Sequence, residues 1–149
     1  AEKFGMEYVD KDGKKKNPYI IHRTSIGCYE RTLALLIEKY AGAFPVWLAP
    51  VQVKFLPIAD RHLDYVYDVK KALEEHGIIR VEIDDRSEKL GYKLREAQLE
   101  KVPYMIVVGD KDIENNTISV RSRKKGDMGS MSIDEFIDII TKEVETKAL

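Results

Sequence analysis

Several features that would indicate a particular class of protein are missing from this sequence. Cys28 is the single cysteine among 149 residues, which excludes an internal disulfide and fits a reducing compartment. No apolar run approaches the roughly 18 residues that span a membrane, and the first residues do not form a signal peptide. The net charge is −1, so the field of the whole molecule does not attract nucleic acid, and any RNA contact requires local basic clusters. We therefore expect a soluble, cytoplasmic protein without membrane contact.

The sequence also lacks a complete catalytic motif. It contains no P-loop and no Gly-x-Gly-x-x-Gly, and its three histidines lie far apart. His62 and His76 bracket a predicted helix and are expected at its surface ends. Cys28 has His22 nearby in sequence, a pair that we interpret as coincidence and not as a nucleophile with its base.

What is present is an ordinary globular balance of 44% hydrophobic and 34% charged residues. The first part predicts a β-hairpin, with alternation over residues 4–8, turn chemistry at 10–13 and a second short extended run at 18–22. Apolar residues at helical spacing predict a helix over 33–40 that Gly42 ends. We expect a connector at 44–50, because it carries two prolines.

From residue 51 onward, strand and helix patterns alternate. Strands are predicted at 51–55, 78–83, 104–108 and 118–120. Helices are predicted after Asp60 as N-cap, around 90–97, and after a capping box made by Ser132 and Glu135. This order indicates an α/β fold in which helices pack on a mixed sheet.

The segment from Pro18 to Arg31 leads from an extended run through Gly27 into the first helix. Two interpretations of Arg31 stay open. It can be a surface arginine paired with Glu30 or Glu38, or its planar guanidinium can lie beside the phosphates or base of a nucleotide.

Three charge-rich segments follow predicted strands, at residues 84–89, 109–112 and 121–125. In a mostly parallel sheet, ligands bind beyond the carboxyl ends of the strands. Carboxylates accept and arginines donate bidentately, which suits the bases of a single-stranded loop. The alternative is a solvated rim of charged turns, and the residue pattern does not decide between the two.

At these segments the sequence resembles threonyl-tRNA synthetases, a family of class II aminoacyl-tRNA synthetases. HRTSIGCYERTLALLIEKYAG followed by FPVWLAPVQV is similar to motif 3 of that family running into the anticodon-binding domain. RVEIDDRSEKLGYKLREAQLEKVPYMIVVGDKD and ISVRSRKKGDMGSM continue the resemblance. It implies a mixed five-stranded sheet with about three packed helices over residues 45–149. Residues 1–44 would be the end of the catalytic domain, a hairpin and a helix.

The resemblance further implies an enzyme that activates threonine with ATP, releasing pyrophosphate and later AMP, and charges tRNA-Thr. Arg31 matches an arginine that contacts ATP, and His22 matches one of three zinc ligands whose partners would lie upstream of residue 1. Motifs 1 and 2 are absent, so this chain by itself is expected to be inactive and to hold no cofactor. Zinc, Mg-ATP, the rest of the catalytic domain and homodimerisation would belong to the intact enzyme.

In this family the second domain reads the guanine and uracil of the anticodon loop of tRNA-Thr. Arg121 matches an arginine of that site, and Asp112 stands where glutamate is expected. Ser87 stands where asparagine is common and Lys101 where arginine is common, and both changes remove hydrogen-bonding capacity. We expect Lys124 and Lys125 to contact phosphates.

Three other hypotheses remain. The chain can be a stand-alone synthetase-like paralogue, a small-ligand α/β binding module, or an active enzyme in its own right. A purpose-built binding module has little reason to keep the motif 3 stretch before Gly42, which favours the synthetase interpretation.

Overall fold

The computed structural model describes residues 1–77 and 79–149. The chain divides into two compact units, Ala1–Leu35 and Leu36–Leu149, and α1 (Tyr29–Tyr40) runs across the division between them. In the part of the chain that is described, no helix combines the length and the apolar character needed to cross a membrane.

The first unit contains a single turn of 3-10 helix, η1 (Glu2–Phe4), and a small antiparallel hairpin of β1 (Tyr8–Val9) and β2 (Lys15–Lys16). The predicted turn is confirmed, since Asp10 N–H donates to the Lys14 carbonyl at 2.9 Å and Gly13 has φ +74°. The prediction of a second strand at residues 18–22 is wrong, because this tight turn brings residues 15–16 opposite β1 instead.

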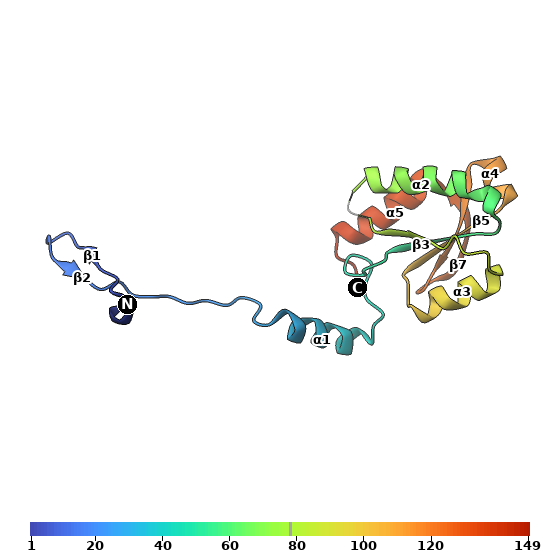
Figure 1. Ribbon diagram of the computed structural model, residues 1–149. Coiled ribbons are helices and arrows are strands. Elements are labelled where there is room, and N and C mark those ends of the chain that lie inside the picture. Colours follow the sequence, from blue (N-terminus) through green and yellow to red (C-terminus); the bar gives the residue numbers. More distant parts are fainter. Residues whose placement is uncertain (78) are drawn as a thin grey trace. The chain divides into compact units, whose positions relative to one another are not determined.

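The second unit is built on a mixed five-stranded sheet (Figure 1). Its strands are β3 (Val53–Pro57), β4 (Val81–Ile83), β5 (Tyr104–Val108), β6 (Thr117–Ser122) and β7 (Gly126–Ser132). They lie in the order β4-β3-β5-β6-β7. β3 is parallel to β4 and β5, whereas β6 is antiparallel to both β5 and β7. The predicted sheet is confirmed.

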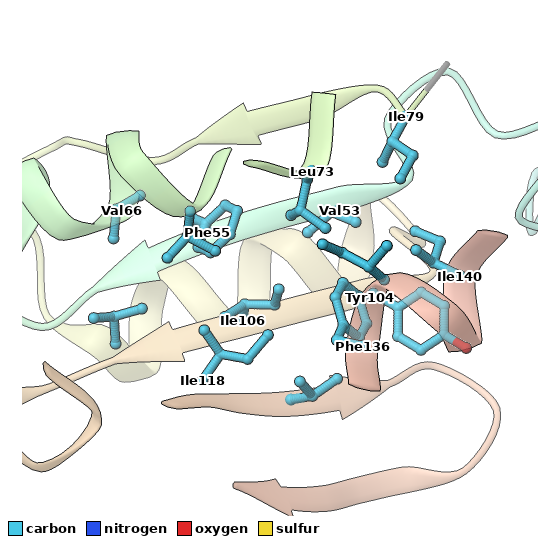
Figure 2. Packing of buried hydrophobic residues seen from close by; sticks show 14 of the residues in the cluster. Val53, Phe55, Val66, Leu73, Ile79, Tyr104, Ile106, Ile118, Phe136 and Ile140 are labelled. Atoms are coloured by element: carbon cyan, nitrogen blue, oxygen red, sulfur yellow. The ribbon is translucent and has the colours of Figure 1, made fainter. Parts of the chain in front are cut away.

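Helices cover both faces of this sheet. α2 (Leu63–Glu75) and α5 (Ile133–Glu145) lie on one face and α3 (Leu90–Leu99) lies on the other (Figure 1). The main core fills the space under α2 and α5, where Tyr104 and Phe136 meet edge to face with ring centroids 5.3 Å apart (Figure 2). A smaller cluster of Leu56, Ala97 and Met105 fixes α3 over β3 and β5.

Three local features differ from the predictions. Asp60 does not cap α2, because a 3-10 turn, η2 (Asp60–His62), precedes the helix. Ala59 is the N-cap of η2, and His62 is the N-cap of α2. The strand predicted at 78–83 is shorter than expected, because β4 begins at Val81; residue 78 lies outside the described residues. The short α4 (Asp110–Asn115) follows β5 and was not anticipated. At α5 the Ser132 cap is confirmed, since its Oγ accepts from Glu135 N–H at 3.2 Å.

Candidate nucleic-acid interface

The predicted site residues lie at both ends of the sheet. Ser87 and Asp112 follow the carboxyl ends of β4 and β5. Because β6 is antiparallel to β5, the carboxyl end of β6 lies at the opposite end of the sheet from the carboxyl end of β5. Arg121 accordingly pairs with Met105 near the start of β5. The expectation of one continuous ridge formed by all three charged segments is therefore wrong. Two of the residues, Asp112 and Arg121, nevertheless come to the same side of the sheet.

Asp112 is held in place by two hydrogen bonds and is only 9% exposed. Its Oδ2 accepts from Gly109 N–H at 2.9 Å, and its Oδ1 accepts from the Ser119 hydroxyl at 2.8 Å. Gly109 also packs tightly, because a Cβ there would come within 2.8 Å of Ile58 Cδ1. The carboxylate thus joins the start of α4 to the middle of β6.

Arg121 lies on the same side of β6 as Ser119. Along this strand Ile118, Val120 and Ser122 are buried, while the alternate residues point away from the main core and stay partly exposed. On this side α3 packs against β3 and β5, whereas the residues of β6 and β7 that point the same way are partly or fully exposed. The Arg121 side chain is 40% exposed, and its closest carboxylate oxygen, on Asp127, is 3.7 Å away.

A bulge between β6 and β7 lies directly beside Arg121. Val120 is opposite Gly129, but Arg121 is opposite Asp127, so Met128 is an extra residue in β7. Gly129 has φ +79°, a backbone conformation that glycine adopts without strain. Bulges bend and twist a strand, and this one therefore helps to set the direction of the Arg121 side chain.

The start of α4 is fixed by a buried histidine that the sequence did not reveal. His62 was expected at the surface but is 1% exposed. Its Nδ1 accepts from Ala59 N–H at 3.2 Å, so Nε2 carries the proton and donates to Asp110 Oδ1 at 2.9 Å. Arg61 donates two further hydrogen bonds to Asp110, at 2.6 and 2.8 Å, and these bonds together with His62 hold the pKa of that carboxyl well below its usual range.

Ser87 is exposed in the loop between β4 and α3 and lines a hollow together with Ile58 and Lys93. Its neighbour Arg86 is not free to bind a ligand, because it donates to both oxygens of Asp84 at 2.8 and 2.7 Å and to Glu96 at 2.5 Å. The Arg86 hydrogen bonds outweigh the effect of burial and lower the pKa of the Asp84 carboxyl.

Lys101 lies at the other end of the sheet, just before β5, in a left-handed backbone conformation with φ +60°. Its ammonium group donates to the Ala41 carbonyl. Lys124 and Lys125 are exposed in the turn between β6 and β7, and their amides donate to the Ser122 hydroxyl at 3.2 and 3.3 Å. All three lysines thus lie at the end of the sheet opposite Asp112.

Arg123 serves a structural purpose that sequence reasoning missed. It donates to the carbonyls of Lys101 and of Ala43 and Phe44, and Phe44 is the first residue of the connector that precedes β3. Burial lowers the pKa of the Arg123 guanidinium. Arg80 holds the same connector further along, through the carbonyls of Ala49 at 2.7 Å and Trp47 at 3.2 Å. No sequence pattern distinguished Arg123 from the solvent-facing basic residues around it.

In the first unit, Arg31 and His22 are exposed. The Cys28 thiol, also exposed, donates to a Glu30 carboxylate oxygen at 2.7 Å. Across residues 1–77 and 79–149, no three His, Cys, Asp or Glu side chains are grouped so that they could hold a metal ion. The role of His22 as a zinc ligand therefore stays a prediction.

Known proteins resemble the chain over nearly its whole length. The chain is 60% identical over 147 residues to a threonine–tRNA ligase of Clostridium botulinum (strain Eklund 17B), which covers 99% of this chain and 23% of the relative. The corresponding ligase of Clostridium perfringens (strain 13) is 58% identical over the same length. The chain therefore spans about a quarter of the length of these relatives.

A solved structure, the RNA binding domain of threonyl-tRNA synthetase from Cryptosporidium parvum, aligns with a TM-score of 0.76 and 29% identity. The alignment covers 95% of this chain and 36% of that one. Residues 46–143, which include the whole five-stranded sheet and its helices up to Glu143, match the anticodon binding domain family. The chain belongs to the family of anticodon-binding domains, and its relatives of high identity within that family are threonine–tRNA ligases.

Proposed function

We propose that this chain binds the anticodon loop of tRNA-Thr as part of a threonine–tRNA ligase in the cytoplasm. Residues 45–149 would form the anticodon-binding domain, and residues 1–44 would belong to a catalytic domain that activates threonine with ATP. The observation that carries the proposal is the open face of β6, where Ser119, hydrogen-bonded to the Asp112 carboxylate, and the half-exposed Arg121 guanidinium lie on the same side of the strand within a matched anticodon-binding domain.

The chemistry of this face suits unpaired bases. Arginine binds two adjacent acceptors on a base edge, and carboxylate or hydroxyl oxygens accept from the imino and amino groups of bases. A folded RNA helix would not present these edges, whereas the splayed bases of a loop do. Arg121 and the group around Asp112 would read bases, and Ser87, which lies at the same end of the sheet as Asp112, would also contact the loop. At the other end, Lys101 would lie close to the RNA backbone.

The intact enzyme would need more than this chain contains. Arg31 would contact ATP, and His22 would supply one of the zinc ligands, in a site completed by residues outside this chain. An autonomous enzyme would catalyse threonine-dependent exchange of pyrophosphate into ATP, and we expect none from the 149-residue chain. Sustained exchange by the purified chain would contradict the proposal that residues outside this chain complete the catalytic site.

The first test is binding to the anticodon stem-loop of tRNA-Thr at fixed salt, measured by fluorescence anisotropy. Arg121→Ala is expected to weaken binding roughly 5- to 150-fold, the value of one bidentate contact to a base. Arg121→Lys should recover little, because it restores the charge but not the planar fork. Lys71→Ala, which removes an exposed charge from α2 on the covered side of the sheet, is the control. Equal affinity of the unaltered chain for an unrelated stem-loop would argue against base recognition.

The second test concerns the lysines of the turn between β6 and β7. Lys124→Ala and Lys125→Ala should each weaken binding to cognate and altered stem-loops by the same factor, because phosphates carry no sequence information. For single-stranded RNA, each lost phosphate contact should reduce the slope of log K against log salt by about 0.7. A slope that does not change in the double variant would place the phosphates elsewhere.

A further inference from the structure

The Asp112 carboxylate is poorly placed to meet a base directly. Both of its oxygens already accept a hydrogen bond, from Gly109 N–H at 2.9 Å and from the Ser119 hydroxyl at 2.8 Å. The residue is 9% exposed, so little of it can reach a ligand on the open face. Something else on this face must supply the acceptor that would lie beside Arg121.

Ser119 has the required properties. A hydroxyl has one proton and two lone pairs, and here the proton is committed to Asp112. Toward an arriving ligand the Ser119 oxygen can therefore only accept. A hydroxyl that donates to a carboxylate becomes a stronger acceptor, because hydrogen bonds in a chain polarise one another. Ser119 is also more exposed than Asp112.

The spacing of Ser119 and Arg121 fits adjacent groups of one base. Both point to the open side of β6, and alternate residues of a strand are about 7 Å apart. The Arg121 guanidinium, which makes no contact with Asp127 shorter than 3.7 Å, can turn its fork toward a ligand. The strand thus presents an acceptor beside a pair of donors.

We propose that Ser119 reads the base through its oxygen, with Asp112 as the residue that orients the hydroxyl and Arg121 as the donor. The base that matches is guanine, which has acceptors at N7 and O6 on its Hoogsteen edge for the guanidinium and an N1–H beside O6 on its Watson–Crick edge for the Ser119 oxygen. Adenine has a donor in place of O6 and an acceptor in place of N1–H, so it clashes with both groups. This assignment rests on the proposed binding of an anticodon loop.

The experiment measures affinities for stem-loops that differ only in the central anticodon base. Ser119→Ala should weaken binding to the guanine loop roughly 3- to 10-fold, as expected for one hydrogen bond to a neutral group. The preference for guanine over adenine should fall by at least the same factor, because the variant also removes the clash with adenine N1. Thr117→Val, which removes a hydroxyl from the same strand and side, is the matched control and should leave the preference intact.

A change on the RNA keeps the test independent of protein folding. A loop with 1-methylguanine lacks the N1 proton, so the unaltered chain should bind it more weakly, while Ser119→Ala should show a much smaller difference between the two loops. Asp112→Asn should reduce the preference for guanine in the presence of Ser119 and have little further effect in the Ser119→Ala background.

The outcomes separate this inference from the function that it rests on. If Ser119→Ala keeps the unaltered preference while Arg121→Ala loses it, the chain reads the base without Ser119 and the inference is wrong. If the unaltered chain binds guanine, adenine and unrelated loops equally, anticodon recognition itself is wrong and the inference is overturned with it.

Discussion

Replacing Phe136 with alanine is expected to lower the free energy of unfolding of the second unit by about 3–5 kcal/mol. The Phe136 ring is fully buried and meets the edge of Tyr104, at the point where α5 closes over β5 (Figure 2). Truncation would remove buried apolar surface and leave a cavity that the rigid sheet cannot close. Urea unfolding followed by circular dichroism measures the change.

Leu99→Ala is the matched control for this variant. Leu99 ends α3 and is 71% exposed, so losing its side chain should change stability by less than about 0.5 kcal/mol. A loss below about 1 kcal/mol for Phe136→Ala would mean that α5 does not complete the main core. The Tyr104 hydroxyl, which donates to Glu143 at 2.9 Å, gives a second contact between α5 and β5 that the variant leaves in place.

Replacing Arg123 with alanine is expected to cost about 2–4 kcal/mol and to release the connector from the sheet. Hydrogen bonds from a charged donor are worth more than neutral ones, and this guanidinium satisfies the carbonyls of Lys101, Ala43 and Phe44. Native-state hydrogen exchange should show faster exchange at the Leu48 and Ala49 amides, both of which donate to the Pro45 carbonyl within the connector.

Two further variants define what Arg123 contributes. Arg123→Lys keeps the charge, but a single ammonium cannot reproduce the fork, so most of the loss should persist. Lys125→Ala changes an exposed residue in the adjacent turn and should leave both stability and connector exchange near those of the unaltered chain. Unchanged exchange in Arg123→Ala would show that Arg80 alone is enough to hold the connector.

The site illustrates how far residue patterns reach. Asp112 and Arg121 were predicted as partners in base recognition, and they do lie on the same side of the sheet. The pattern could not show that β6 reverses direction relative to β5, which separates Arg123, Lys124 and Lys125 from the carboxyl ends of the parallel strands. It also could not show that the Ser119 hydroxyl donates a hydrogen bond to the Asp112 carboxylate, because that contact depends on how α4 packs against β6.

The sequence by itself determined those elements whose apolar spacing is strong. The buried run of β5, the inner faces of α2 and α5, the Ser132 cap and the turn before β2 are all confirmed, because each depends on residues that are near in sequence. The resemblance to an anticodon-binding domain was likewise carried by the residues alone.

The tertiary structure decided the features that depend on distant partners. β7 has almost no apolar alternation, and it is a strand because β6 supplies its hydrogen bonds. His62 is buried because Asp110, far along the chain, meets its ring. Arg123 reaches carbonyls 79 and 80 positions away, and at that separation local pattern carries no information about the contact.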